Sequence, residues 1–183
     1  MTARRTAVYV AIWLLLTAYD VAVDRGARPG APAPMPGHGA LLDFNRADVI
    51  GIDLESGRRR VRALDAGDRW RVVEPEENAP PGDLITAMVA AVTEARDLEI
   101  ADADGTHARE LGVDGSSRRI TLKRRDGSST TIVLGSRSPS QTAVYAQREG
   151  AREIVLLGLD VQYYFDLVME SVGGRQSAVG SRQ

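Results

Sequence analysis

The sequence predicts an α+β protein with a single N-terminal transmembrane helix. An uncharged apolar run lies near the N-terminus, short alternating runs typical of antiparallel strands follow, and two segments have helical periodicity. The expected order is β-β-β-α and then β-β-β-β-α. The expected regions are a cytoplasmic N-terminus with its anchor (1–24), a spacer (25–40), an exported α+β domain (41–172) and a disordered tail (173–183).

The proposed anchor is the run TAVYVAIWLLLTAYDVAV, residues 6–23. A helix of this length spans about 27 Å, close to the roughly 30 Å hydrocarbon core of a bilayer. Its apolar residues lie on all sides, whereas a surface helix of a soluble domain has one apolar stripe. Arg4 and Arg5 precede the run, so the positive-inside rule leaves the N-terminus in the cytoplasm and exports the main domain.

A cleaved signal peptide is the main alternative to this anchor. It also begins with positive charge, but its apolar core is usually shorter and ends at a small-x-small cleavage site. The residues at the end of the apolar run, TAYDVAVDRG, offer no good match to such a site. We therefore expect an uncleaved single-pass anchor, with cleavage as the second interpretation and a buried helix of a soluble fold as the third.

The spacer holds Pro29, Pro32, Pro34 and Pro36 among Gly and Ala residues, a composition typical of an extended, semi-rigid linker. His38 lies in this linker and is expected to be solvated.

Three strands are expected next, in DVIGIDLE, RRRVRALD and WRVVEP. Their connections are short, which favours an antiparallel meander. A helix follows PPGD, with Asp83 as its predicted N-cap. Its core-facing side should pack on the meander through Ile85, Met88, Val89 and Val92.

The region 97–117 looks irregular, with a short strand at 98–100 and a short helix that begins at Thr106 and stops at Gly112. Four further strands are expected in RRITLKRR, TTIVLG, AVYAQR and EIVLL, the first two joined by an Asp126-Gly127 turn. The last helix should bury one face, formed by Val161, Tyr164, Phe165, Val168, Met169 and Val172. The two halves suggest a weak internal duplication.

Composition limits the chemistry. The net charge of -2 gives no reason to expect nucleic acid as a partner. The chain has no cysteine, which excludes disulfides, thiolate metal sites and cysteine nucleophiles. A serine hydrolase would need a histidine beside its nucleophile, but the domain holds only His107 and no G-x-S-x-G motif. We therefore expect no catalytic residue, and an exposed His107.

The string DADGT resembles the start of a calcium loop, with Asp102, Asp104 and Gly105 at the first, third and fourth positions. Thr106 stands where the third ligand belongs, and Val113 stands where the loop needs its glutamate. An Asx-rich turn is the preferred interpretation. We expect neither a metal site nor a cofactor-binding site.

Basic clusters at 58–62 and 123–125 could meet anionic headgroups or an acidic partner. We favour the simpler interpretation that they keep strand faces soluble and protect sheet edges. Glu74, Glu76 and Glu77 could contact a partner, although a solvated loop is the preferred interpretation.

Several strings, in order, resemble domain-of-unknown-function family 4340. These are DVIGIDLE, WRVVEP, the helix after PPGD, ELGVD, ITLKRRDG, TIVLGSRSP and VYAQREGAREIVLL, which together span roughly residues 48–172. ELGVD departs from the family pattern because it lacks the usual aromatic before Gly112. The resemblance implies a membrane-anchored protein beside gliding-motility-type ABC transporter components, and it implies no catalytic residues.

The expected function is therefore a non-enzymatic, single-pass accessory subunit of a bacterial membrane complex. Its exported domain would make protein–protein contacts, with an ABC permease and ATPase as candidate partners, and residues 6–23 would contact the bilayer. The alternatives are a structural subunit of a different membrane assembly and a domain that binds or hydrolyses an envelope polymer.

Overall fold

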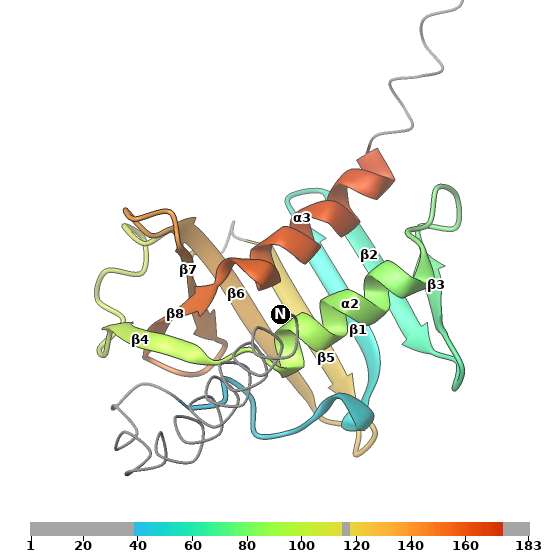
Figure 1. The fold of residues 1–183 in the computed structure, drawn as a ribbon, viewed down its shortest axis with the longest axis horizontal. Helices are drawn as coiled ribbons and strands as arrows, with labels where there is room; N and C mark the ends of the chain where they lie inside the picture. Colours follow the sequence, from blue (N-terminus) through green and yellow to red (C-terminus); the bar gives the residue numbers. More distant parts are fainter. Residues whose placement is uncertain (1–38, 115–117, 174–183) are drawn as a thin grey trace, which may run out of the picture. The chain divides into compact units, whose positions relative to one another are not determined.

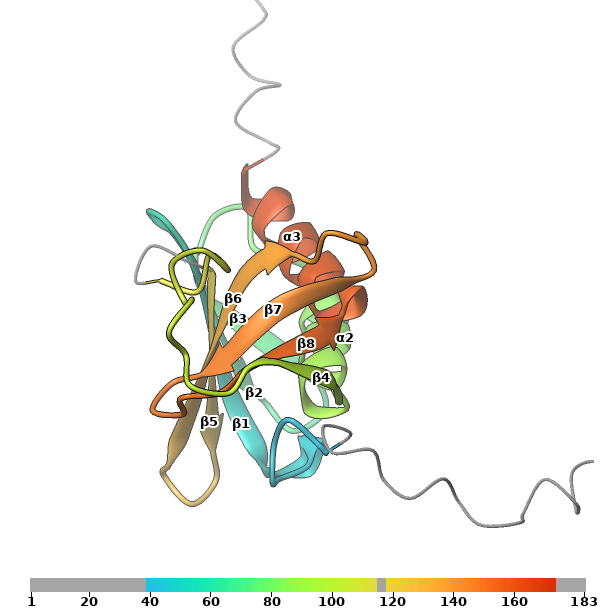
Figure 2. The ribbon, with the colours of Figure 1, turned by 90° about the vertical axis from the view of Figure 1, so that its left-hand side faces the viewer.

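The computed structural model describes residues 39–114 and 118–173. They form one antiparallel sheet with two helices on the same face, so the predicted α+β class is confirmed (Figures 1 and 2). The anchor at 6–23, most of the spacer and the tail from 174 lie outside these residues. No helix within the described ranges is long and apolar enough to cross a membrane.

The first half of the domain follows the predicted order of three strands and a helix. A short 3-10 helix η1 (Arg46–Asp48), capped by Asn45, precedes the first strand. The elements after it are β1 (Val49–Ser56), β2 (Arg59–Asp65), β3 (Trp70–Glu74) and α2 (Gly82–Thr93).

The second half has one strand more than the predicted β-β-β-β-α order. That strand, β4 (Asp97–Asp102), is longer than the short strand expected at 98–100. The other elements follow the predicted order: β5 (Arg118–Arg124), β6 (Ser129–Arg137), β7 (Ala143–Arg148), β8 (Ile154–Gly158) and α3 (Leu159–Gly173).

All eight strands join in a single sheet with the order β3-β2-β1-β5-β6-β7-β8-β4. Both predicted meanders are present, and their first strands, β1 and β5, pair with each other in antiparallel register. Strand β4 pairs with β8 and so forms one edge of the sheet, while β3 forms the other. The sequence does not indicate either long-range pairing, because both join elements that are distant along the chain.

The main core lies between the sheet and the two helices. Ile52 pairs with Ala63 of β2 and with Leu122 of β5, and all three side chains are buried on the helix side. Helix α2 buries Ile85, Met88, Val89 and Val92, as its periodicity predicts. Helix α3 buries Val161, Phe165, Val168 and Met169 and packs Tyr164 and Val172 against them, again as predicted.

The predicted N-cap of the first helix is wrong by two residues. Helix α2 begins at Gly82, and Pro81 takes the capping position without a side-chain hydrogen bond. The chain passes so close to β3 here that a Cβ at residue 82 would lie 2.8 Å from the carbonyl oxygen of Trp70. Asp83 instead lies in the first turn, where a carboxylate still interacts favourably with the helix dipole.

The short helix predicted from Thr106 to Gly112 is also wrong, since hydrogen-bonded turns occupy this segment. The amide of Val113 donates to the carbonyl of Ala108 at 2.7 Å, which breaks the helical pattern, and Gly112 has a left-handed φ of 71°. This segment, residues 103–113, packs on the sheet face opposite the helices. It covers a second, smaller core of Val113, Val133 and Ile154, bordered by Ala108, Leu111 and Tyr145.

Candidate interaction surface

One part of the sheet has no covering layer among the described residues: the face of β3, β2, β1 and β5, with the start of β6, that points away from the helices (Figure 2). Cross-strand partners share a face and neighbours alternate. Because Ile52 and Ala63 point into the core, Asp53 and its partner Arg62 point outward. We call this surface the charged face and define it as Asp53, Glu55, Arg60, Arg62, Arg71, Glu74, Arg119, Thr121, Lys123, Thr131 and Glu149.

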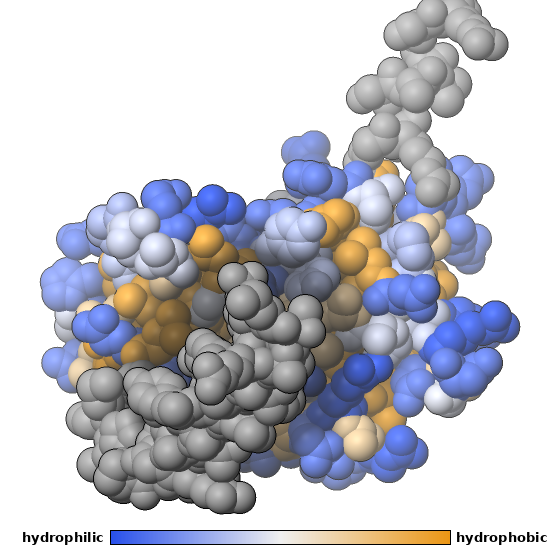
Figure 3. Space-filling view, viewed as in Figure 1, coloured by the Kyte–Doolittle hydropathy of each residue, from blue (hydrophilic) through white to orange (hydrophobic). Residues whose placement is uncertain are grey.

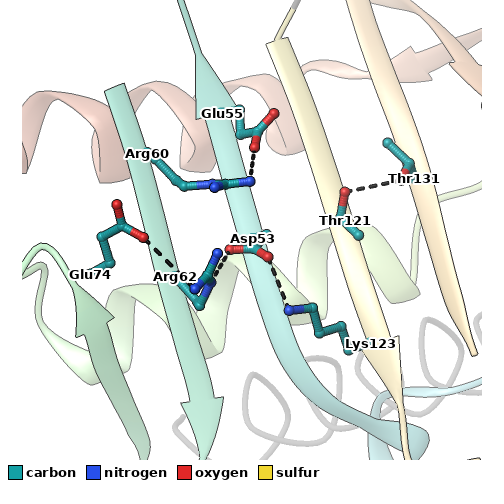
Figure 4. Close-up of polar contacts among 8 residues, drawn as sticks. All are labelled: Asp53, Glu55, Arg60, Arg62, Glu74, Thr121, Lys123 and Thr131. Carbon is teal, nitrogen blue, oxygen red and sulfur yellow. Dashed lines mark hydrogen bonds and ion pairs between the residues drawn. The ribbon is translucent and has the colours of Figure 1, made fainter. Parts of the chain in front are cut away.

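Asp53 lies at the centre of the charged face, between Arg62 and Lys123 (Figure 4). Its exposed fraction is only 7%, and among the described residues it is the one charged residue that is buried as a whole. The Nε–H of Arg62 donates to Oδ1 of Asp53 at 2.9 Å, and Nζ of Lys123 lies 3.1 Å from Oδ2. A buried carboxylate is stable in this setting because two cations from neighbouring strands compensate its charge.

The pKa of Asp53 reflects this balance. Burial alone raises the pKa of the carboxyl, but the hydrogen bonds and charges of Arg62 and Lys123 outweigh burial and lower it below the ordinary value. Asp53 is therefore ionised at neutral pH. It holds both cationic side chains in place on the outer face of the sheet.

Ion pairs continue to both sides of this centre. Arg62 also approaches Glu74 of β3, with Nη1 4.0 Å from Oε2. Arg60 bonds to Glu55, and Arg119 bonds to Glu149. Each carboxylate of the charged face therefore has a basic partner, so the face presents alternating charges in a fixed arrangement.

Two exposed apolar side chains border this array. Leu64 and Val73 have exposed fractions of 37% and 40%. Leu64 lies beside Gly51, where a Cβ would come within 3.2 Å of its Cδ2 atom. Ordered charges beside accessible apolar groups are typical of surfaces that bind other proteins.

The structure assigns His107 and Asp102 to a turn. Oδ1 of Asp102 accepts hydrogen bonds from the backbone amides of Asp104 and Gly105, and Oδ2 accepts one from the amide of His107 at 2.8 Å. The imidazole is exposed, and its Nδ1 lies 3.4 Å from Oδ2 of Asp102 and 3.1 Å from Oγ1 of Thr106. This is the Asx-type turn that the sequence favours, because the Asp102 carboxylate binds backbone amides.

The described part of the chain offers no candidate metal site. In residues 39–114 and 118–173, no group of three or more His, Asp or Glu side chains is arranged to hold a metal ion.

The two basic clusters divide between the two sides of the sheet. Arg60, Arg62 and Lys123 meet on the charged face, where each contacts a carboxylate. Arg59 points the other way and donates to the carbonyl oxygen of Met169 in α3 at 3.2 Å. Arg124 lies over the ring of Phe44, 4.8 Å from its centroid.

Asp53 is the functional candidate that sequence reasoning missed. The only local signal is an acidic residue between Ile52 and Leu54, in a strand that is apolar up to that point. Its significance depends on Lys123, which reaches it through the pairing of β1 with β5. That pairing joins the two halves of the chain, and no short-range pattern specifies it.

A protein-family model matches a region of this chain that covers most of the sheet and both helices. This family model matches residues 70–170, more than half of the 183 residues. The chain belongs to the family described as Domain of unknown function (DUF4340). This confirms the resemblance seen in the sequence.

The DUF4340 match begins at Trp70, the first residue of β3. Strands β1 and β2 precede it, so Asp53 and Arg62 lie outside the matched residues whereas Lys123 lies inside them. No curated protein matches this DUF4340 chain, and no solved structure matches it.

Proposed function

We propose that this DUF4340 chain is a non-enzymatic, single-pass accessory subunit of a bacterial membrane complex. The apolar run at 6–23 would anchor it in the inner membrane, and the α+β domain would lie on the extracytoplasmic side. The family resemblance favours an ABC permease and ATPase as the partners. The domain would serve the complex by binding another subunit through the charged face.

The charged face is the observation that carries this proposal. Its charges come from the four neighbouring strands β3, β2, β1 and β5 and from Glu149, and most are held by one another, as with Asp53 between Arg62 and Lys123. A partner with complementary charges would meet side chains that are already ordered, so little conformational entropy is lost on binding. Alternating signs also disfavour wrong registers, because a shifted partner places like charges together.

A binding role also agrees with the chemistry of the described residues. The domain's only histidine, His107, lies on an exposed turn next to a carboxylate that binds backbone amides. Hydrolysis of an envelope glycan would need two carboxyl groups across a substrate cleft. The acids of the charged face are ion-paired with arginine or lysine, which suits recognition better than proton transfer.

Co-purification from native membranes tests this proposal. The full chain would be extracted in mild detergent, and its companions identified and quantified. We expect a permease and an ATPase in stoichiometric amounts with the wild type. The double variant Arg60→Glu/Arg71→Glu should lose them, while Glu170→Lys, an exposed charge reversal on α3, should retain them.

Three results would contradict parts of the proposal. A stable complex without an ATPase would exclude the transporter assignment and indicate a structural subunit of another assembly. Retention of every companion by the folded double variant would exclude the charged face as the binding surface. A protein that is extracted without companions would contradict the accessory role itself.

A further inference from the structure

The second accessible feature of the domain is the outer edge of the sheet at β4. Strand β4 is the last strand in the sheet order, and beyond Asp97 no described strand pairs with its outer side (Figure 1). An edge strand offers unpaired amide and carbonyl groups that can accept another strand. Proteins commonly protect such edges with proline, bulges or charged residues, above all lysine. Strand β4, with the sequence DLEIAD, has neither lysine nor proline, and its charged residues are all acidic.

The apolar side chains of β4 are unusually exposed. Leu98 and Ile100 have exposed fractions of 46% and 37%, and four of the six residues of β4 are exposed. Apolar residues are visible towards this end of the sheet on the helix side (Figure 3). Covering the two aliphatic side chains would remove apolar surface from water and so favour binding.

The chain's own residues 39 and 40 already pair with the start of this edge. Ala40 forms an antiparallel bridge with Arg96, and the amide of Asp97 donates to the carbonyl of Gly39 at 3.2 Å. A strand added beyond Asp97 would continue this backbone pairing. Register shifts in the β4–β8 pairing lie between Asp97 and Glu99 and again between Ile100 and Asp102, so the accessible stretch is short.

The charges of β4 indicate the chemistry of its partner. Asp97 and Glu99 flank Leu98, and the strand itself carries no basic residue. Oδ1 of Asp97 is buried, and no described residue donates a hydrogen bond to it. Buried acceptors normally have donors, so a lysine or arginine beside Asp97 would satisfy this oxygen. A second copy of β4 is disfavoured, since it would place acidic strands side by side.

We propose that the β4 edge binds a short extended segment of a partner protein in which basic residues alternate with aliphatic ones. The segment adds to the sheet as a ninth strand. Its backbone pairs with residues 98–102, its aliphatic side chains cover Leu98 and Ile100, and a basic side chain reaches Asp97. This inference rests on the proposed function, because it gives a second contact to the partner complex.

The test uses the full chain in mild detergent and a labelled eight-residue peptide that alternates lysine and valine. Peptide binding is measured by fluorescence anisotropy, and backbone protection by hydrogen exchange. We expect protection of the β4 amides on binding. The variant Leu98→Lys/Ile100→Lys should bind at least tenfold more weakly, and a glutamate–valine peptide should not bind.

The matched control is Tyr163→Lys, which changes an exposed side chain of α3 outside both β4 and the charged face. Equal loss of binding in the control and the β4 variant would overturn the inference, as would protection confined to the charged face. Protection of the β4 amides that do not pair with β8, seen before peptide is added, would also overturn it, because the chain's own residues before Gly39 or a second copy would then occupy the edge.

The two proposals fail separately. Companions that are lost with Arg60→Glu/Arg71→Glu but retained by the β4 variant would support the accessory function and exclude the β4 edge as a contact with those companions. Companions that are lost with both variants would support both surfaces.

Discussion

The Nζ atom of Lys123 lies 3.1 Å from Oδ2 of Asp53, and the guanidinium of Arg62 binds the other carboxylate oxygen. One acid in β1 thus connects β2, from its own meander, to β5, from the second half of the chain. The side chains at the centre of the charged face are therefore ordered only when β1 pairs with β5. This arrangement also makes Asp53 the residue whose replacement is most informative.

Replacing Asp53 with Asn should destabilise the domain by about 1–3 kcal/mol, because it leaves two cations without their shared anion. The loss stays in this range since Arg62 and Lys123 are partly exposed and retain water contacts. Thermal unfolding of the full chain in detergent would measure it. Asp68→Asn, in the exposed β2–β3 turn, is the control and should change stability little.

Stability should fall with acid in a way that depends on Asp53. Its pKa is lowered in the folded protein, so the carboxylate stabilises the fold above the unfolded value of about 4, and that contribution is lost as the pH falls through the folded pKa. Asp53→Asn should show a shallower loss below about pH 4. Unfolding measured at several pH values would test this, and an unchanged acid slope would contradict it.

Some acid dependence should remain in that variant. Hydrogen bonds, chiefly from the His107 amide, lower the pKa of Asp102, and hydrogen bonds from Ser128 lower that of Asp126. Both carboxylates also lose stabilising contacts when they are protonated.

Helix α3 offers a matched pair of aromatic residues. Phe165 is buried against the sheet, whereas Tyr163, in the same helix, has an exposed fraction of 60%. Phe165→Ala should destabilise the domain by about 3–5 kcal/mol through the cavity it leaves. Tyr163→Ala should change stability by about 0.5 kcal/mol. Similar losses for the two variants, measured by thermal unfolding, would contradict the packing of α3 on the sheet.

Gly135→Ala should displace the segment 103–113. A Cβ at residue 135 would lie 2.3 Å from the carbonyl oxygen of Leu111 and 2.7 Å from Cγ2 of Val113. Hydrogen exchange should therefore become faster in residues 106–113 while the β1–β2 hairpin is unaffected. Gly51→Ala is the control, since its Cβ would meet only the movable end of Leu64 and the side chain of Lys123.

The anchor can be tested with one charge. Leu15→Arg places an arginine near the middle of the apolar run and should weaken insertion by about 3 kcal/mol. Extraction of membranes at alkaline pH should then release part of the variant, while the wild type and Leu15→Met stay in the membrane. Complete release of the wild type would contradict a transmembrane anchor.

Local patterns in the sequence were sufficient to predict most individual elements. Alternation predicts β2 and β5, the Asp126-Gly127 pair predicts the β5–β6 turn, and helical spacing predicts the buried faces of α2 and α3. These features depend on neighbours within about ten residues, where periodicity and turn chemistry act directly. The family also follows from the order of such strings.

Only the tertiary structure decided how these elements join. The pairing of β1 with β5, the place of β4 beside β8 and the packing of residues 103–113 on the face opposite the helices all depend on contacts between distant segments. The same contacts override the local signals for a cap at Asp83 and a helix after Thr106, because close approaches at Gly82 and Gly135 dictate the chain path there. Asp53 receives its two cations, and β4 its open edge, from this arrangement of the whole sheet.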